Sequence, residues 1–176
     1  VSAASVLMFL VLLASSLTFD SPASAGSIVI RVPRDHETMQ AAINAANPGD
    51  TILVASGTYY EHIIVNKTLS LIGENKETTV IDGNRTGIVV KITASNVNFT
   101  EFTVRRSGQT WMNSGIFLSF GSRSNKISGN IVTDNYFGVF LDASNDNIIS
   151  SNNVSWNSGV GIYMESCTGN TVSVNS

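Results

Sequence analysis

The sequence predicts an all-β fold, a right-handed parallel β-helix whose short strands wind into stacked coils behind an N-terminal capping helix. The first observation is a repeat: the tetrapeptides Gly-Ile-Phe-Leu, Gly-Val-Phe-Leu and Gly-Ile-Tyr-Met begin at residues 115, 138 and 161, at a constant step of 23 residues. The second is that an Asn-rich segment follows each tetrapeptide. A period in the low twenties, built of short alternating runs and turn residues, is typical of a solenoid. Leucine-rich repeats share that period, but here the inward positions are mostly Ile and Val, which favours the β-helix.

Residues 1–25 have the pattern of a secretory signal peptide. An apolar run of 12 residues, 6–17, is too short to span a bilayer, which takes about 20 residues. Small residues follow at Ala23 and Ala25, as in an A-x-A cleavage site. The basic start of such a peptide is missing, and the chain begins with Val. The pattern predicts a secreted or cell-surface protein; the alternative is a segment that stays uncleaved and attaches the protein to a membrane.

Residues 26–50 contain an expected first strand, 28–32, and the one expected helix, 38–46. The helix has apolar residues at i, i+3, i+4 and i+7, which places them on one face. These residues are Met39, Ala42, Ile43 and Ala46. A solenoid exposes the apolar end of its first coil, so we expect this helix to cover that end.

Residues 51–176 alternate between short strands and turns and have room for about six coils of about 20 residues each. Before the clean repeats, strands are expected at 51–54, 63–65, 69–72, 80–81, 89–92, 97–99 and 102–104. The sequence stops in mid-repeat without a polar cap. We therefore expect the β-helix to be truncated at its C-terminus and the chain to be a fragment of a longer protein.

Composition excludes some classes of partner and site. Only 13% of the residues are charged and the formal net charge is −3, which argues against a nucleic-acid partner. Cys167 is the only cysteine, so no internal disulfide is expected. Four Asn-x-Ser/Thr sequons are possible glycosylation sites or simply Asn-rich turns: Asn66, Asn84, Asn98 and Asn153.

Strand alternation assigns the repeated residues to faces, because successive side chains point to opposite sides of a strand. The inward columns are expected to be buried: Ile116, Val139 and Ile162, and Leu118, Leu141 and Met164. An outward column of aromatic residues lies between them: Phe117, Phe140 and Tyr163. These three are the ligand-binding candidates, because exposed rings offer flat faces to sugars. The alternative is a surface stack that only stabilises the coils.

The next outward column holds Ser119, Asp142 and Glu165. On adjacent coils the two carboxylates would lie about 5 Å apart, near the separation of a retaining glycosidase pair. Asp142 and Glu165 are therefore weak catalytic candidates; a weak calcium site or two ordinary solvated carboxylates are the alternatives. A third column, Asn130, Asn152 and Asn175, predicts a structural ladder of stacked amides.

Two segments carry a resemblance to a known family. Residues 32–52 contain Thr-Met-Gln-Ala-Ala-Ile-Asn-Ala-Ala-Asn-Pro-Gly-Asp-Thr-Ile, and residues 57–75 contain Gly-Thr-Tyr-Tyr-Glu and Val-Asn-Lys-Thr-Leu-Ser-Leu-Ile-Gly-Glu-Asn. Together they resemble the pectin-lyase-like superfamily, and more closely its NosD-type β-helix proteins, over residues 32–176. The resemblance implies a right-handed β-helix, but a shared fold does not carry a shared reaction.

Catalytic segments of the enzymes in this superfamily are absent. The Gly-x-Tyr-x-Glu element of pectin methylesterases is present at 57–61, but their Gln-Asp-Thr and Asp-Phe-Ile-Phe-Gly segments are missing. The Gly-His-Gly and Arg-Ile-Lys segments of polygalacturonases and the Arg-x-Pro-x-x-Arg segment of pectate lyases are missing too. NosD is described as copper-binding, yet the possible copper ligands are scattered: His36, His62, Met39, Met112, Met164 and Cys167. No metal site is therefore expected.

The sequence favours an exported, non-catalytic β-helix that binds glycans or proteins or is structural. One alternative is a carbohydrate-active enzyme, a polysaccharide lyase or hydrolase, whose catalytic coils lie outside this fragment or at Asp142 and Glu165. Another is a NosD-like protein of copper-site maturation. Polysaccharides or cell-surface glycans are the expected partners.

Overall fold

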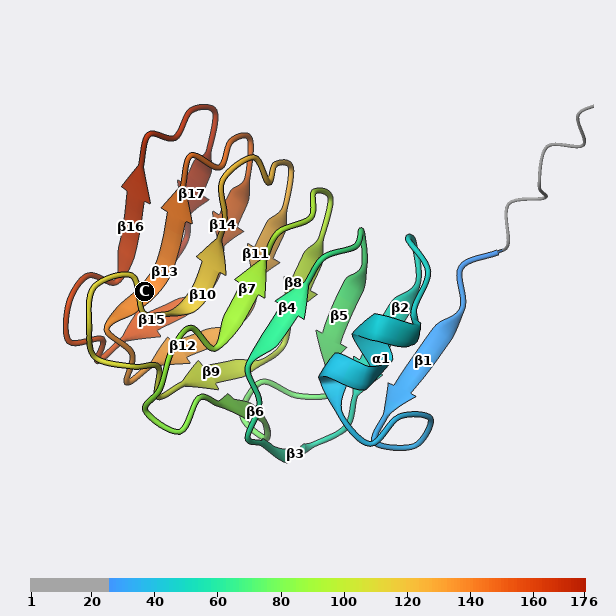
Figure 1. The fold of residues 1–176 in the computed structure, drawn as a ribbon. Coiled ribbons are helices and arrows are strands. Elements are labelled where there is room, and N and C mark those ends of the chain that lie inside the picture. Colours follow the sequence, from blue (N-terminus) through green and yellow to red (C-terminus); the bar gives the residue numbers. More distant parts are fainter. Residues whose placement is uncertain (1–25) are drawn as a thin grey trace, which may run out of the picture.

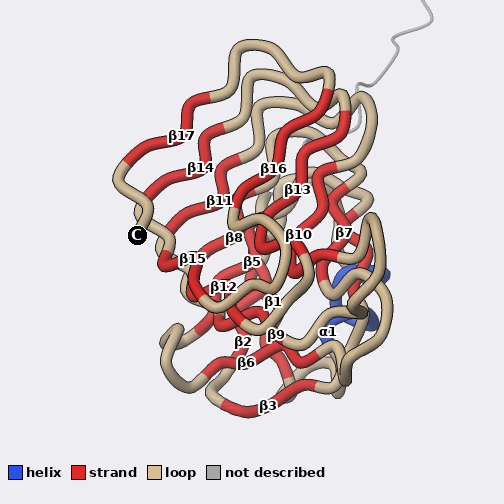
Figure 2. Tube along the Cα trace, turned by 90° about the vertical axis from the view of Figure 1, so that its left-hand side faces the viewer, coloured by secondary structure: helices blue, strands red, loops and turns tan. Residues whose placement is uncertain are grey.

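The computed structural model describes residues 26–176, which form a parallel β-helix of about six turns with one short helix at its N-terminal end (Figure 1). The expected signal peptide, 1–25, lies outside the described residues. Three parallel sheets form the faces of the solenoid, and each sheet is a column of strands contributed by successive coils (Figure 2). The all-β prediction is confirmed.

Sheet A has seven strands: β1 (Val29–Val32), β2 (Thr51–Val54), β5 (Ser70–Gly73), β8 (Asn98–Thr100), β11 (Lys126–Ser128), β14 (Ile148–Ser150) and β17 (Thr171–Ser173). Sheet B has five: β3 (Gly57–Tyr59), β6 (Thr79–Asp82), β9 (Thr103–Arg105), β12 (Ile131–Thr133) and β15 (Asn153–Ser155). Sheet C has five: β4 (Ile63–Val65), β7 (Val90–Ile92), β10 (Ser114–Leu118), β13 (Phe137–Asp142) and β16 (Ile162–Glu165).

The register of sheet C confirms the 23-residue step. Ile116 pairs with Val139 and Val139 with Ile162, so equivalent residues lie directly above one another. Four of the six residues expected inside are fully buried: Ile116, Leu118, Val139 and Leu141. Ile162 is only half-buried and Met164 is 45% exposed, because they belong to the last coil and no described coil packs beyond it.

Helix α1 (Met39–Ala45) covers the first coil, as predicted, and buries Met39, Ala42 and Ile43 against it. Thr38 caps the helix, since its hydroxyl accepts a hydrogen bond from the Ala41 N–H.

Side chains from the first coil hold both ends of α1. The Glu61 carboxylate accepts the N–H groups of Met39 and Gln40 at 3.0 and 3.1 Å. At the other end, the Lys67 ammonium donates to three carbonyl groups at 2.7–3.1 Å, those of Ile43, Asn44 and Ala46. Each charge complements the dipole of the helix end that it contacts.

Buried asparagines line the corners of the later coils. Asn130 accepts the Phe102 N–H on the coil before it and donates to Asn152 on the coil after it; Asn152 in turn donates to Asn175. The predicted ladder therefore exists. Asn125, Asn147 and Asn170 form a second column and Asn135 and Asn157 a third.

The asparagines also explain the glycines that open the first two repeats. A Cβ on Gly115 would lie 2.7 Å from the amide nitrogen of Asn135, and one on Gly138 would lie 2.9 Å from that of Asn157. Both positions therefore exclude a side chain.

Candidate functional site

An aromatic cluster covers the outer face of sheet C. Phe117 and Phe140 point out of the solenoid on adjacent strands, with ring centroids 5.1 Å apart, as the register predicted. Phe137 joins them, with its ring 5.4 Å from that of Phe140 and stacked 5.2 Å from that of Tyr163. Tyr136 packs against the same group. This aromatic cluster (Phe117, Tyr136, Phe137, Phe140 and Tyr163) forms a small apolar core outside the coils.

The expectation of an exposed Phe column is wrong in one respect. Phe117 is only 5% exposed and Phe140 only 1%, so neither ring offers a free face; Tyr163 is half-buried. The reason is that Phe137, which was not part of the predicted column, and the neighbouring tyrosines pack over the phenylalanine rings. A ligand on this face would therefore meet the residues at the edge of the cluster.

Trp111 is the most exposed ring that contacts the cluster. It lies in the connection between β9 and β10, and its indole makes edge contacts with Phe137 at 5.4 Å and Tyr163 at 5.9 Å. The side chain is still 59% exposed. Trp111 lies outside the 23-residue repeat, so the assignment of outward columns from that repeat could not include it. The length of the connection that carries Trp111 was the one feature of the sequence that pointed to this segment.

Hydrogen bonds to later coils hold the segment that carries Trp111. The Ser107 N–H donates to Asn135 and its hydroxyl accepts the Tyr136 N–H, both at 3.0 Å. The Ser158 hydroxyl donates to Gln109 at 2.6 Å, and the Phe137 N–H donates to the Asn113 carbonyl at 3.1 Å. Hydrogen bonds thus fix the connection on both sides of Trp111.

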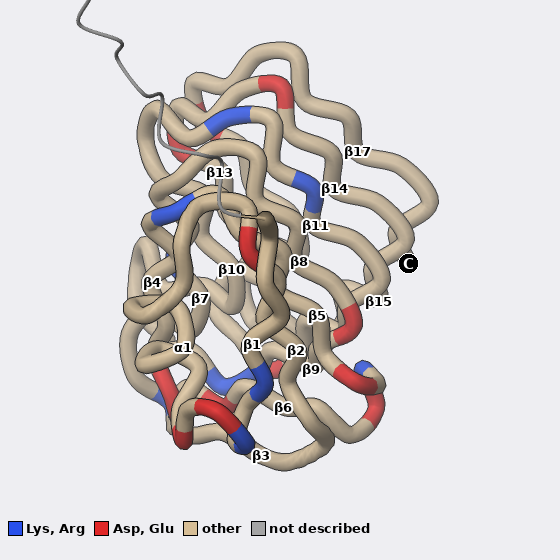
Figure 3. The backbone as a smooth tube through the Cα atoms, turned by 90° about the vertical axis from the view of Figure 1, so that its right-hand side faces the viewer, with Lys and Arg blue, Asp and Glu red and all other residues tan. Residues whose placement is uncertain are grey.

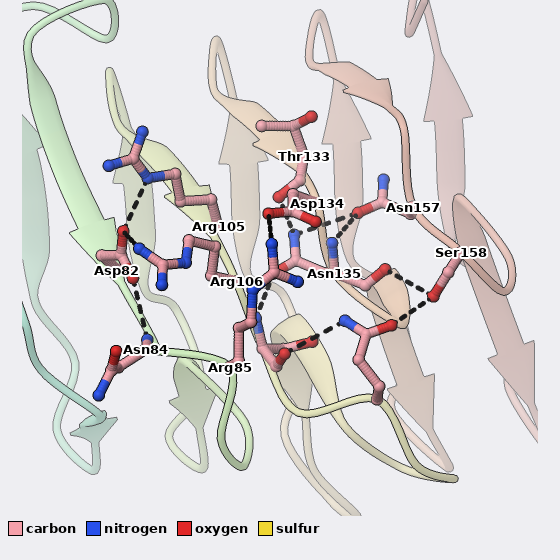
Figure 4. A network of polar contacts seen from close by, with 12 residues as sticks. Asp82, Asn84, Arg85, Arg105, Arg106, Thr133, Asp134, Asn135, Asn157 and Ser158 are labelled. Atoms are coloured by element: carbon pink, nitrogen blue, oxygen red, sulfur yellow. Dashed lines mark hydrogen bonds and ion pairs between the residues drawn. The ribbon is translucent and has the colours of Figure 1, made fainter.

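A polar network lies beside this segment (Figure 4). The buried Asp82 carboxylate contacts Arg105 at 2.8 Å and Arg106 at 3.2 Å and accepts the Asn84 N–H. Burial alone would raise the pKa of Asp82, but the Asn84 N–H and the two guanidinium groups outweigh it and hold that pKa below its usual value. The carboxylate is therefore ionised at neutral pH and fixes the outer face of sheet B.

The predicted acidic pair lies at the end of sheet C that follows the cluster. Asp142 pairs in register with Glu165, and each residue is two positions beyond an aromatic residue of the cluster, Phe140 or Tyr163. Asp142 is half-buried and Glu165 exposed. Within residues 26–176 neither makes an ion pair. Their catalytic and calcium-binding roles remain predictions.

The sequon asparagines lie on the surface to different degrees. Asn66, Asn84 and Asn153 are exposed, and Asn98 is half-buried in β8. The side chains are accessible at three of the four positions, and their glycosylation remains a prediction.

The fold is a parallel β-helix of the pectin-lyase-like kind, and the candidate site lies on its outer surface. Residues 43–176 match the family described as "Periplasmic copper-binding protein (NosD)", and the chain belongs to that family. No curated protein matches the chain. Among the residues described, no helix is both long and apolar enough to cross a membrane.

Solved structures similar to the chain include pectin methylesterases. One, in complex with a hexasaccharide, has a TM-score of 0.55 and 13% identity over 82% of this chain. PemA from Erwinia chrysanthemi has a TM-score of 0.51 and 11% identity over 73% of it. The chain spans 54% of each of these proteins. At such low identity the likeness shows the fold alone.

The copper in the family's description does not fit the donors found here. Residues 26–176 contain no group of three or more His, Cys, Asp or Glu residues able to hold a metal ion. Met39 is buried in the core, and both ring nitrogens of His62 lie within hydrogen-bond distance of protein oxygens, on Ile88 and Thr86. Met164 and Cys167 line a common hollow, on the last coil. Two donors without a third do not make a well-defined copper site.

Proposed function

We propose that this protein is an exported β-helix that binds glycans on the outer face of sheet C, with Trp111 as the principal contact. The observation that carries the proposal is an indole that stays 59% exposed while Phe137 and Tyr163 fix its orientation. A large exposed ring with a fixed orientation is typical of a binding site, because little conformational entropy is lost when a ligand packs on it.

The chemistry of the face suits a sugar. The C–H groups of a pyranose ring pack on aromatic faces, which Trp111 and the half-buried Tyr163 supply. The hydroxyl groups of a sugar need hydrogen-bond acceptors, and the carboxylates of Asp142 and Glu165 lie on the same strands as the cluster. A chain of sugars following sheet C would cross from the tryptophan to the acidic pair.

An extracytoplasmic location supports this function. The family is described as periplasmic, and residues 1–25 have the pattern of an export signal. Secretion or display at the cell surface would bring the face of sheet C to polysaccharides of the envelope or the surroundings.

A glycan array probed with the full chain tests the proposal. Trp111→Ala is expected to weaken binding about tenfold or more, as is common for a tryptophan at the centre of a binding site. Trp156→Ala is the matched control, because Trp156 is 89% exposed and makes no ring contact among the described residues. Equal losses in the two variants, or none in either, would contradict a site at Trp111.

The enzymatic alternative has its own test. We expect no release of reducing ends from any polysaccharide that the array identifies, because the catalytic segments of the superfamily's enzymes are absent from the sequence. If product does appear and Asp142→Asn abolishes it while Trp111→Ala only weakens substrate binding, the acidic pair is catalytic and the non-enzymatic proposal fails.

A further inference from the structure

A concave site lies on a different sheet from the aromatic cluster. A cavity of about 270 Å³ opens on the outer face of sheet A, where β1, β2 and β5 lie side by side. It is lined by Arg31, Val32, Pro33, Arg34, Leu53, Val54, Ala55, Ile72 and Glu74. Pockets for drug-sized molecules are about 300–1,000 Å³, so this one suits a smaller ligand.

The floor of the cavity is apolar. Leu53 pairs in register with Ile72, and both side chains point out of the solenoid, opposite to the buried Ile52 and Leu71. They are half-buried although they face outward. A small apolar group would therefore bury surface that these two side chains leave open to water.

Three charged side chains line the cavity, those of Arg31, Arg34 and Glu74. Arg31 pairs in register with Leu53 at one side of the floor, and its guanidinium makes no hydrogen bond or ion pair within residues 26–176. Arg34 is already engaged by Asp35 at 2.9 Å. Asp35 does not line the cavity, so Glu74 supplies the negative charge of the lining. Arg31 and Glu74 thus flank an apolar floor, and charged residues gather at this end of the molecule (Figure 3).

Glu74 is held in position with one oxygen free. Its Oε2 atom accepts the N–H and the hydroxyl of Ser56, each at 2.8 Å. The backbone bond first and the hydroxyl bond second lower the pKa of Glu74 below its usual value, against a small opposing effect of burial. Its Oε1 atom has no hydrogen-bond partner among the described residues.

We propose that this cavity binds a free α-amino acid with an apolar side chain. The carboxylate of the ligand pairs with the Arg31 guanidinium, whose fork of N–H groups matches carboxylate geometry. Its ammonium group donates to Glu74 Oε1. Its side chain packs on Leu53 and Ile72. A zwitterion fits the site better than a simple anion, because the lining offers both a guanidinium without a partner in the described residues, that of Arg31, and a carboxylate with one free oxygen, that of Glu74.

Isothermal titration of the full chain with three probes tests each part of this arrangement. Leucine carries both charges, 4-methylpentanoate lacks the ammonium group, and 3-methylbutylamine lacks the carboxylate. We expect leucine to bind about tenfold or more tightly than either analogue, as the loss of one charge-assisted hydrogen bond predicts. Absence of leucine binding at millimolar concentration, or equal affinity for leucine and 4-methylpentanoate, would overturn the proposal.

Two variants with matched controls locate the binding. Arg31→Gln and Glu74→Gln are each expected to weaken leucine binding about tenfold. The exposed residues Arg123 and Glu77 lie outside the cavity, so Arg123→Gln and Glu77→Gln should leave it unchanged. Leucine affinity that survives Arg31→Gln places the ligand elsewhere and overturns the assignment. Trp111→Ala should not alter leucine binding, so this test does not depend on the glycan proposal.

Discussion

At the scale of single residues, each corner of a coil depends on two consecutive residues, a ladder asparagine and the residue just before it. The residue before each ladder asparagine has a left-handed backbone: φ is 54° at Asp134, 57° at Ser151 and 57° at Trp156. The asparagine that follows turns its amide into the solenoid, where its oxygen accepts the backbone N–H of the asparagine one coil earlier and its nitrogen donates to a carbonyl group of that coil. The sharp bend and the hydrogen bonds that satisfy its buried backbone groups thus come from consecutive residues.

Asn130→Ala should lower the stability of the fold. The Asn130 side chain accepts the Phe102 N–H and donates to the Phe99 carbonyl and to Asn152, and all of these groups are buried. An unsatisfied buried group costs about 1–3 kcal/mol, so we expect a loss of that order in urea unfolding. Asn153→Ala, an exposed neighbour in β15, is the control and should change stability by less than about 0.5 kcal/mol.

Asp82 should make the stability depend on pH on the acid side. Because the pKa of Asp82 is lowered in the folded state, its stabilising effect is fully present above the unfolded-state value of about 3.9. It is lost as the pH falls through the lowered value. Asp82→Asn should therefore be less stable than the wild type at pH 7, and the difference should shrink as the pH falls below about 5.

Urea unfolding of both proteins from pH 7 to pH 2.5 measures this effect. Glu77→Gln, an exposed carboxylate without an ion pair in the described residues, is the control and should follow the wild type throughout. A constant difference between wild type and Asp82→Asn at all pH values would contradict the role given to the Asp82 charge.

At the scale of elements, α1 covers the first coil and in turn is stabilised by contacts with that coil. A helix of seven residues is too short to be stable alone in water. Lys67→Met removes the ammonium that binds three carbonyl groups at the end of α1 while keeping most of the side chain's length. We expect a loss of about 1–2 kcal/mol, measured by thermal unfolding. Lys126→Met, an exposed lysine in β11, should have little effect.

The repeat predicted most of the elements but not the functional face. The 23-residue step predicted the stacking of Ile116 on Val139, and the helical spacing of apolar residues predicted α1. Burial of Phe117 was missed because it depends on Phe137, whose place in the cluster is a matter of packing and not of strand alternation. Trp111 was missed because a connection between strands has no period from which its position follows.

At the scale of the whole molecule, the coil stack supplies two separate outer faces, an aromatic one on sheet C and a cavity with an apolar floor and charged sides on sheet A. Each face is built from several coils, because neighbouring residues on a face come from positions 19 to 28 apart in the sequence. A substitution that disturbs one coil should therefore alter the site to which that coil contributes residues and leave the other site in place.

The prediction for copper concerns the molecule as a whole, since no local cluster of ligands in the described residues would form a copper site. We expect the full chain not to take up stoichiometric Cu(I) in competition with a chelator, because the described part holds no group of three or more His, Cys, Asp or Glu residues and the hollow at Met164 and Cys167 offers two donors. Any residual weak binding should disappear in Cys167→Ser. Tight stoichiometric binding that survives this substitution would show that other residues form a site.

The number of residues per coil varies, and this determines where the chain tolerates insertions and deletions. Thr51 and its partner Ser70 are 19 residues apart, whereas Ser70 and its partner Asn98 are 28 apart, yet both pairs keep the same register. Nearly all the extra length is taken up in turns, and the connection from Arg105 to Ser114 that carries Trp111 is another such long turn. Insertions and deletions there alter what the surface presents and leave the scaffold intact. That turn is therefore the natural point for grafting a foreign loop, whereas a single residue inserted within a strand such as β13 would move the inward side chains beyond it to the outer face.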